Sequence, residues 1–391
     1  MSLLILGSIF LLLAALPIPG YAEFMAGVFG PSWSKFFLVP FSMTMNIMTI
    51  YVVIGIARGM ANQYKIDEVA CMLWGLGSFL ILTPASKFET GNYLPMSNFG
   101  AGGLFLGMIS AILTVEIINF VLKRGWKISL PESVPANVSK SFEALIPGLF
   151  VMVIFTSINL IFAATEYQTA NNFIFKFIQG PLTSLGATLP AMIIFLVIET
   201  LLFSFGLHGP NIVGAITTPI WTALTVENAE AFAVGAPLPN IINYQFYGNY
   251  IKLGGCGATI GLALLCLFAA KSAQFKTLGK VAIGPAIFNI NEPLIFGVPI
   301  VLNPVMMIPF ILTPIVLAIA TYTVMSIGLV PITNGANIPW TTPPIFSGLL
   351  LSGWRGAVWQ VVEIVICAAI SFPFFKMEDN RAYKQETEEA N

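Results

Sequence analysis

The chain has 391 residues, of which 57% are hydrophobic and only 9% are charged, and its formal net charge is −1. Soluble domains carry about 25% charged residues, so this composition excludes a soluble globular protein and indicates an integral membrane protein. A net charge near zero also provides no basic surface for nucleic acid, and we expect no nucleic-acid partner.

Apolar runs long enough to cross about 30 Å of hydrocarbon recur along the whole chain. They are of helical length and lack the alternation of an outer-membrane barrel, so they predict an all-α polytopic membrane protein. The first run, Leu3 to Leu16, has no basic residues before it and no cleavage pattern after it, which favours a transmembrane segment over a signal peptide. The predicted spans are 3–19, 36–57, 69–83, 99–122, 142–164, 187–207, 257–270, 294–329 and 348–375.

The C-terminal half contains segments that interrupt this helical pattern. Segment 294–329 is too long for one straight crossing, and its prolines at 299, 304, 309 and 314 predict breaks. Regions 208–256 and 330–347 are rich in Gly, Pro and Asn. At membrane depth, non-helical backbone is tolerated only where protein covers it or where it lines a wet cavity. We therefore predict re-entrant hairpins or cavity-lining loops in these two regions, and we place the functional half after about residue 185.

Basic residues gather in four places along the chain. By the positive-inside rule such clusters face the cytoplasm, which predicts a cytoplasmic N-terminus and a cytoplasmic tail over 378–391. The clusters are Arg58 with Lys65, Lys123 with Arg124, Lys127 and Lys140, Lys271 with Lys276 and Lys280, and Lys376 with Arg381 and Lys384.

Cysteine and histidine are too sparse for metal chemistry. The chain has one histidine and no CxxC pattern, so we expect no metal site, no disulfide framework and no cofactor. Small apolar packing is the expected role of the thiols, which are Cys71, Cys256, Cys266 and Cys367.

One carboxylate, Glu292, stands in an apolar stretch that prolines interrupt. An ionised Glu is costly to bury in hydrocarbon, so such a residue usually faces a partner, a cavity or a substrate path. Asn289 and Asn291 flank it, and the three side chains cannot share one helical face, which favours an extended or turning segment. A carboxylate held by neighbouring amides is the structural alternative. The functional interpretation is a ligand, or a proton acceptor, for a substrate hydroxyl.

The single histidine, His208, follows the apolar helix predicted over 187–207 and precedes Gly209 and Pro210, which end helices. One interpretation is a cap on the C-terminus of that helix. The other is hydrogen bonding or proton exchange with a substrate. Glu199 lies nine positions earlier, on roughly the opposite helix face, so we do not expect it to be the partner of His208.

Two more segments combine glycine or aromatic residues with polar ones. The glycine-rich stretch 252–259 lacks the ending of a phosphate-binding loop, which favours close backbone approach to another helix or to a ligand. Within 338–344, Trp340 offers an aromatic face beside the hydroxyls of Thr341 and Thr342, which suits a sugar ring in a half-wet site. Anchoring at the membrane interface is the alternative role of this tryptophan. Asn334 and Asn337 add polarity to the same segment.

At these segments the chain resembles the membrane-embedded IIC subunit of the lactose/cellobiose/diacetylchitobiose class of bacterial sugar phosphotransferase systems. The most specific motif is Phe-Asn-Ile-Asn-Glu-Pro at 288–293, followed by Phe-Gly-Val-Pro-Ile-Val-Leu-Asn-Pro at 296–304. Gly-Leu-His-Gly at 206–209 and Gly-Gly-Cys-Gly-Ala-Thr at 254–259 support it in the same order. The resemblance runs from the first span to the last.

The resemblance implies a fold of about ten transmembrane helices, with two re-entrant hairpins in the C-terminal half. It implies that residues 1–165 hold a homodimer together, that 166–376 bind the sugar and move in an elevator-like way, and that 377–391 form a cytoplasmic tail. It also implies a multi-pass protein in the lipid bilayer of the bacterial inner membrane. The disaccharide that it carries would be phosphorylated by a phosphocysteine on a separate IIB protein, with IIA as a further partner.

By the same resemblance, Glu292 and His208 are the catalytic residues, because they would contact the sugar hydroxyl that accepts phosphate. We expect no fused IIA or IIB domain, so the chain would be the non-phosphorylated membrane component of the phosphotransferase. The family usually has an amphipathic segment before the first span, so we expect a shortened N-terminus here. The expected substrate-binding residues are Asn289, Asn291, Asn211, Gly254, Gly255, Trp340 and Thr341.

An ion-coupled secondary transporter of a small polar solute is the alternative function, in which Glu292 and His208 would carry protons. Acids that could continue a proton relay are few in the C-terminal half, Glu199 and Glu363 being examples, and this scarcity speaks against it.

Overall fold

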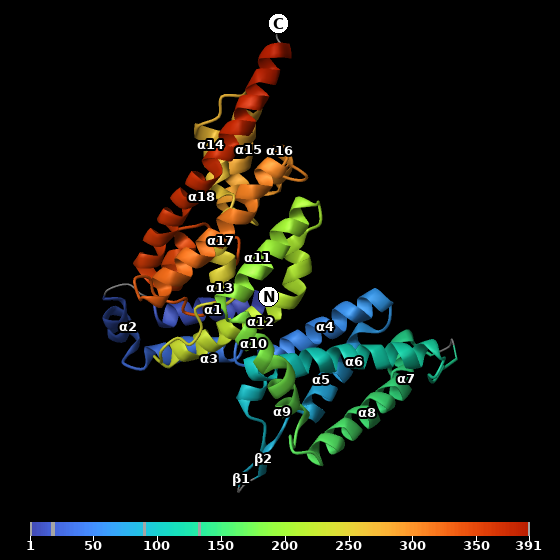
Figure 1. The fold of residues 1–391 in the computed structure, drawn as a ribbon. Helices are drawn as coiled ribbons and strands as arrows, with labels where there is room; N and C mark the ends of the chain where they lie inside the picture. Colours follow the sequence, from blue (N-terminus) through green and yellow to red (C-terminus); the bar gives the residue numbers. More distant parts are fainter. Residues whose placement is uncertain (1, 17–19, 89–90, 132–133, 390–391) are drawn as a thin grey trace. The chain divides into compact units, whose positions relative to one another are not determined.

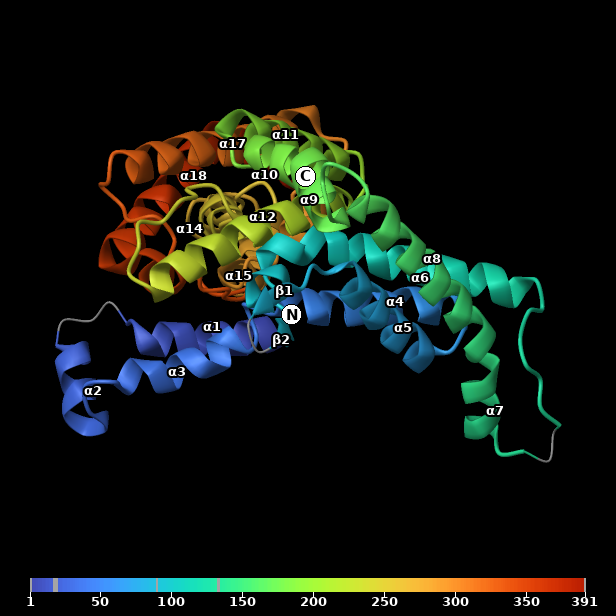
Figure 2. The ribbon, with the colours of Figure 1, turned by 90° about the horizontal axis from the view of Figure 1, so that it is seen from below.

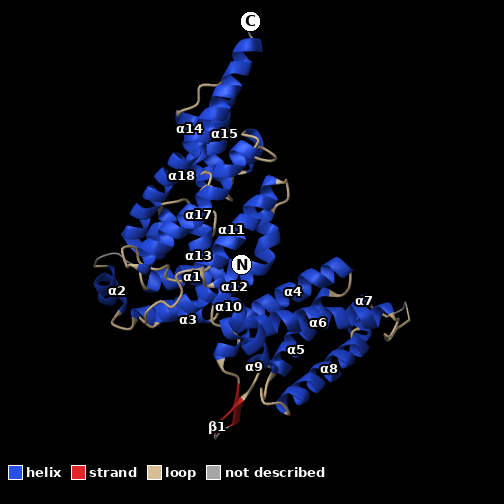
Figure 3. Cartoon of the chain, in the orientation of Figure 1, coloured by secondary structure: helices blue, strands red, loops and turns tan. Residues whose placement is uncertain are grey.

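The computed structural model describes residues 2–16, 20–88, 91–131 and 134–389. Residues 17–19 at the end of the first predicted span and residues 390–391 of the predicted tail lie outside the described residues. The described chain is almost entirely helical (Figure 1), and Figure 3 shows its one short hairpin, β1 (Ser86–Phe88) antiparallel to β2 (Gly91–Tyr93). The chain divides into two compact units, one of Ser42–Leu182 and the other of Met1–Phe41 with Thr183–Asn391.

The first unit, Ser42–Leu182, is a bundle built on four long helices, α4, α5, α6 and α8 (Figure 2). Polar residues inside it join helix to helix: the hydroxyls of Ser78 on α5 and Thr114 on α6 lie 2.6 Å apart. Small residues allow close approach, as at Gly107, where an added Cβ would meet Thr49 of α4. Its elements are α4 (Met48–Tyr64), α5 (Glu68–Leu82), η1 (Met96–Asn98), η2 (Ala101–Gly103), α6 (Leu104–Lys123), α7 (Ala136–Glu143), α8 (Leu145–Ala163), α9 (Ala170–Ile174) and η3 (Phe175–Gln179).

The second unit packs α14 against α15 and α18, and α11 against α12 and α17. Its first three helices precede the other unit in sequence. Helix α1 contacts a later part of the chain: the backbone amide of Asn337 donates to the Ser8 hydroxyl at 2.7 Å. Its elements are α1 (Ser2–Ala14), α2 (Tyr21–Phe29), α3 (Trp33–Ser42), α10 (Gly180–Gly186), α11 (Leu189–Ser204), α12 (Gly209–Ala233), α13 (Tyr244–Phe246), η4 (Tyr247–Ile251), α14 (Ile260–Phe268), α15 (Ala273–Ile287), α16 (Glu292–Gly297), α17 (Pro304–Ser326) and α18 (Phe346–Glu389).

Four helices of the described chain are long and apolar enough to cross a membrane, or five if the bent pair Ala170–Gly186 and Leu189–Ser204 forms one span. The all-α polytopic membrane fold is therefore confirmed. The four are Ala101–Lys123, Leu145–Ala163, Pro304–Ser326 and Phe346–Glu388.

Of the helix breaks predicted in the proline-rich segment 294–329, the structure has one. Residues 298–303 separate α16 from α17, but Pro309 and Pro314 lie inside α17, so the breaks predicted there are wrong. Membrane helices tolerate proline where neighbouring helices and hydroxyl side chains satisfy the freed backbone groups. Here α17 packs against α11 and α18, and the Thr313 hydroxyl donates to the Pro309 carbonyl at 2.6 Å.

The two regions rich in Gly, Pro and Asn differ in structure. About half of 208–256 is the 25-residue helix α12, whereas 330–345 contains no helix or strand. Buried amide side chains hold this second segment: Asn228 donates to the Thr333 carbonyl at 3.0 Å, Asn243 to the Thr333 hydroxyl at 2.8 Å, and Gln245 to Asn337 at 2.8 Å. Because buried backbone and amide groups must be hydrogen-bonded, these contacts fix the course of the loop that carries Trp340.

Candidate functional site

A cavity of about 400 Å³ lies within the second unit, among the ends of helices and the loops that join them. This volume is within the range of about 300–1,000 Å³ that small-molecule sites occupy. Seven of the nine residues predicted for the site line it, and the other two, Gly254 and Thr341, are not among the lining residues. The seven are His208, Asn211, Gly255, Asn289, Asn291, Glu292 and Trp340.

Glu292 is the first residue of the short helix α16, and the turn before it delivers it to the cavity. Asn289 takes the left-handed backbone conformation, with φ 61°, so the chain reverses between α15 and α16 as the spacing of the three polar residues predicts. The Glu292 side chain is exposed, and its carboxylate accepts no hydrogen bond from the described residues. A carboxylate that the protein leaves unsatisfied is available to a ligand hydroxyl.

Asn289 and Asn291 are buried, and their amides mostly bind protein. Asn289 accepts a hydrogen bond from the Gly254 amide at 2.8 Å and donates to the Trp340 carbonyl at 2.6 Å. Asn291 donates to the Cys256 carbonyl at 2.6 Å. These two amides therefore connect the Glu292 turn to the glycine-rich loop and to the tryptophan loop, which makes them positioning residues in this geometry.

His208 caps the helix that follows it, not the one before. Helix α11 ends at Ser204, and the His208 Nδ1 accepts a hydrogen bond from the backbone amide of Asn211, in the first turn of α12, at 3.3 Å. The C-terminal cap proposed as the structural alternative is therefore wrong, because Gly209 and Pro210 begin a helix here, as proline does at the first helical position. With Nδ1 as acceptor, the proton of the neutral ring is on Nε2, and that N–H is the donor left for a ligand.

The glycine-rich loop 252–259 makes the close approach that the sequence favoured. Gly254 and Gly255 have φ of 76° and 99°, and a Cβ on Gly255 would lie 2.5 Å from the Asn291 Cγ. The Gly254 amide donates to the Asn289 side chain, so Gly254, which was predicted to bind sugar, contacts a residue of the cavity wall. Gly255 itself lines the cavity.

Trp340 lines the cavity and keeps 48% of its surface exposed. Its ring is available to stack on a ligand, and its backbone is fixed by Asn289. The neighbouring Thr341 is half-buried and lies outside the cavity lining.

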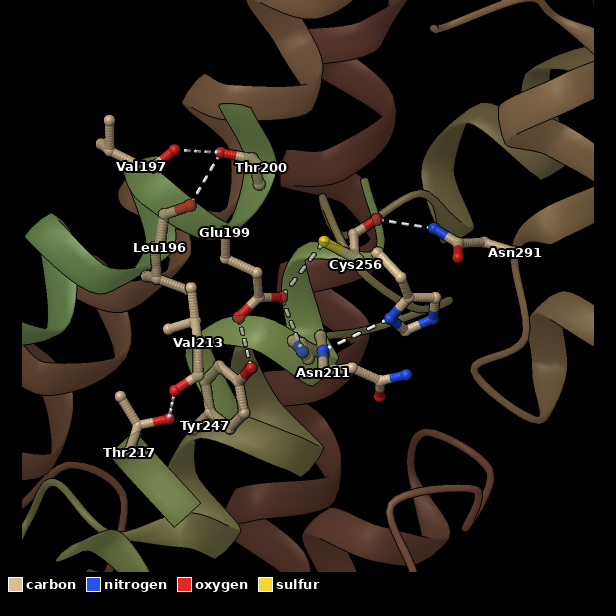
Figure 4. A network of polar contacts seen from close by, with 12 residues as sticks. Leu196, Val197, Glu199, Thr200, Asn211, Val213, Thr217, Tyr247, Cys256 and Asn291 are labelled. Atoms are coloured by element: carbon tan, nitrogen blue, oxygen red, sulfur yellow. Dashed lines mark hydrogen bonds and ion pairs between the residues drawn. The ribbon is translucent and has the colours of Figure 1, made fainter. Parts of the chain in front are cut away.

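The predicted site left out four residues that form one cluster beside it. They are Glu199, Tyr247, Cys256 and Lys252, and Figure 4 labels the first three. Glu199 on α11 is 1% exposed. Its carboxylate accepts hydrogen bonds from Tyr247 and Cys256. It also forms an ion pair with Lys252, whose Nζ lies 2.7 Å away. Tyr247, Lys252 and Cys256 also line the cavity. An acid in the middle of the predicted span 187–207 was the available signal, but its partners are about 50 residues away in sequence.

Comparisons with known proteins show which family the chain is similar to. The family described as "Phosphotransferase system, EIIC" matches residues 1–314. The chain is 42% identical to the lichenan permease IIC component of Bacillus subtilis (strain 168), over 99% of this chain and 88% of that protein. It is 41% identical to the PTS system cellobiose-specific EIIC component of Geobacillus stearothermophilus, over 99% of this chain and 89% of that one.

A solved structure is similar along the same length. The crystal structure of the transporter ChbC, the IIC component from the N,N'-diacetylchitobiose-specific phosphotransferase system, covers 99% of this chain and 92% of its own. The TM-score is 0.95 and the sequence identity is 42%. On the match of four-fifths of its length to the family and on these two relatives, this chain belongs to the phosphotransferase system EIIC family of membrane permeases.

Proposed function

We propose that this permease binds a disaccharide of the cellobiose, diacetylchitobiose or lactose type in the cavity around Glu292 and carries it across the membrane for phosphorylation. The observation that carries the proposal is the grouping of a free carboxylate, an Nε2–H donor on His208 and an exposed Trp340 ring on one cavity. Sugars are bound by such a set, because hydroxyls need hydrogen-bond partners and the C–H faces of the ring pack on aromatic side chains. Relatives named for lichenan, cellobiose and diacetylchitobiose support this class of substrate.

The phosphoryl group comes from the phosphocysteine of a separate IIB protein. A IIA protein in turn supplies the phosphoryl group to IIB. The sulfur–phosphorus bond breaks, a bond forms between phosphorus and the sugar hydroxyl oxygen, and the cysteine leaves as a thiolate. Glu292 accepts the hydroxyl proton, and His208 Nε2–H holds the same hydroxyl in place. Because the transition state of phosphoryl transfer is loose, positioning contributes more than base strength.

The proposal includes the architecture that the family resemblance implies. Ten transmembrane helices, with re-entrant segments in 208–256 and 330–347, would span the bacterial inner membrane. Residues 1–165 would hold a homodimer together, residues 166–376 would move with the sugar, and 377–391 would form the cytoplasmic tail. Cysteine cross-linking between neighbouring protomers within 1–165 tests the dimer: cross-links confined to 166–376 would contradict it.

Phosphorylating uptake in membrane vesicles tests the function directly. The vesicles contain phosphoenolpyruvate and the general phosphotransferase proteins, and the product is the phosphorylated disaccharide inside them. We expect uptake to stop when IIB is omitted and to continue when the proton gradient is collapsed. Loss of uptake with the proton gradient, independent of IIB, would favour an ion-coupled carrier instead.

A further inference from the structure

The carboxylate of Glu199 is buried beside the sugar cavity and holds three donors at once. The Lys252 Nζ lies 2.7 Å from its Oε1, the Cys256 Sγ donates to the same oxygen at 3.1 Å, and the Tyr247 hydroxyl donates to Oε2. The side chains of Glu199 and Lys252 are 1% and 15% exposed. A buried ion pair gains little net stability, because both ions lose their hydration. The presence of this pair at the wall of the cavity therefore suits a role in the site.

Lys252 brings a positive charge to the cavity. Among the described residues that line the cavity, it is the one lysine or arginine. Its Nζ also lies 4.3 Å from the centre of the Tyr247 ring, which is within the range of a cation–π contact. The carboxylate and the ring together hold the ammonium at the wall of the cavity.

The same geometry leaves the ammonium able to bind a ligand. An ammonium has three N–H donors, and the contacts with Glu199 and with the ring face do not use all of them. Tyr247 and Cys256 also donate to Glu199, so this carboxylate keeps two hydrogen bonds when Lys252 turns towards an oxygen in the cavity. The arrangement suits a lysine that binds negative charge during part of the reaction cycle.

Phosphoryl transfer brings negative charge to the cavity. A disaccharide is neutral, but the group arriving from the phosphocysteine carries about two negative charges and approaches the Glu292 carboxylate. Cations that offset the charge on the phosphoryl oxygens contribute much of the catalysis in phosphoryl transfer. We propose that Lys252 binds the phosphoryl oxygens as the phosphate passes to the sugar, and that Glu199 is the positioning residue that holds the Lys252 ammonium at the cavity wall. This inference rests on the proposed function.

Paired substitutions separate this role from simple stability. Lys252→Met alone leaves Glu199 buried without its cation, and Glu199→Gln alone leaves the ammonium without its anion, so either change disturbs the fold. The double variant Glu199→Gln/Lys252→Met removes both charges and keeps side chains of similar volume. Lys252→Arg keeps the charge and serves as the conservative variant. Glu363→Gln is the matched control, because Glu363 is also a fully buried acid of this unit, bound by the Thr321 hydroxyl at 2.5 Å, and is not among the residues that line the cavity.

Two readouts are measured for each purified variant: the affinity for the unphosphorylated disaccharide, and the rate of sugar phosphorylation with the phosphorylated IIB protein that supports the wild-type protein. We expect the double variant to bind sugar within about threefold of wild type and to phosphorylate it about 10²–10³-fold more slowly. Lys252→Arg should restore most of the lost rate, and Glu363→Gln should match wild type in both.

Three outcomes decide the matter. If the double variant phosphorylates sugar at the wild-type rate, the inference is wrong. If its sugar affinity falls as much as its rate, Lys252 binds the sugar itself and the inference is again wrong. If the wild-type protein binds sugar but IIB never phosphorylates it, the proposed function fails, and that failure is visible before any variant is compared. Should the double variant not fold, Glu199→Gln/Lys252→Gln, which also removes both charges, takes its place, and Lys252→Arg is expected to be at least about tenfold faster than it.

Discussion

The two compact units of this protein use buried polar side chains for different purposes. In Ser42–Leu182 they join helix to helix: the hydroxyls of Ser78 on α5 and Thr114 on α6 lie 2.6 Å apart. In the other unit, amides such as Asn243 and Asn289 hold segments that are neither helix nor strand. A helix satisfies its own backbone, whereas irregular backbone at membrane depth needs side-chain partners.

The difference indicates which of the two units has the candidate site. Polar groups buried in a bilayer protein are costly, so a unit that uses many of them to hold loops must need the loops. Here the loops present Glu292, Gly255 and Trp340 to one cavity. Substitutions in the loop-holding unit should therefore change sugar handling, whereas matched substitutions in the helical bundle should change stability alone.

Glu292→Gln should have the largest effect. We expect phosphorylating uptake to fall about 10²–10⁴-fold, because the amide cannot accept the hydroxyl proton. The melting temperature should stay close to that of wild type, since the carboxylate binds none of the described residues. Glu116→Gln is the control in the bundle: this acid accepts a hydrogen bond from the Tyr64 hydroxyl at 2.5 Å, and uptake should be unchanged. Equal losses in both variants would remove the distinction between the units.

Asn289→Ala should damage both the fold and the site. The change removes the acceptor of the buried Gly254 amide and the donor to the part-buried Trp340 carbonyl, and each loss costs about 1–3 kcal/mol. We expect a lower melting temperature and at least about tenfold weaker sugar binding, because two walls of the cavity lose their connection. Asn172→Ala, at an exposed amide of the bundle that donates to the Tyr167 carbonyl, is the control, and its sugar affinity should not change.

Trp340→Ala should weaken sugar binding about tenfold, since an aromatic contact contributes about 1.5 kcal/mol. Trp340→Phe keeps an aromatic face and should stay within about threefold of wild type. Trp126 of the bundle is the matched control: it is 45% exposed, against 48% for Trp340, and it stacks on Phe150 with 5.5 Å between ring centres. If Trp126→Ala weakened binding equally, the stacking role of Trp340 would be untenable.

Ser78→Ala should have the smallest effect. Hydrogen bonds between membrane helices contribute about 0.6 kcal/mol on average, so we expect a small decrease in melting temperature. Sugar affinity and uptake should both equal wild type. A sugar-binding defect in this variant would mean that the bundle takes part in the site.

Much of the site could be predicted from the sequence, because its central residues stand in one short motif or next to glycine and proline. Glu292, Asn289 and Asn291 are separated by a few positions, and His208 is the single histidine of the chain. Apolar length predicted the four helices that are long enough to cross a membrane, which overlap the predicted spans 99–122, 142–164, 294–329 and 348–375. Proline was the main source of error: Pro210 begins a helix and Pro309 lies inside one, since the context on either side decides which of these roles a proline takes.

The Glu199 and Lys252 pair could not be predicted in the same way. The two residues are 53 positions apart, on α11 and just after η4, and tertiary packing alone brings them together. The sequence placed Glu199 and His208 on one presumed helix, whereas α11 ends at Ser204 and His208 caps the start of α12. It contained no periodicity that connects an acid in an apolar span to a lysine beside a glycine-rich loop.

Binding of unphosphorylated sugar to the detergent-purified protein, with no ion gradient, tests the central claim most directly. Cellobiose, lactose and diacetylchitobiose are titrated by calorimetry against wild type and against Glu292→Ala. We predict saturable binding of at least one of the three to the wild-type protein, and its loss in the variant. Binding that is equal in both proteins, or absent from both, would contradict a sugar site built around Glu292.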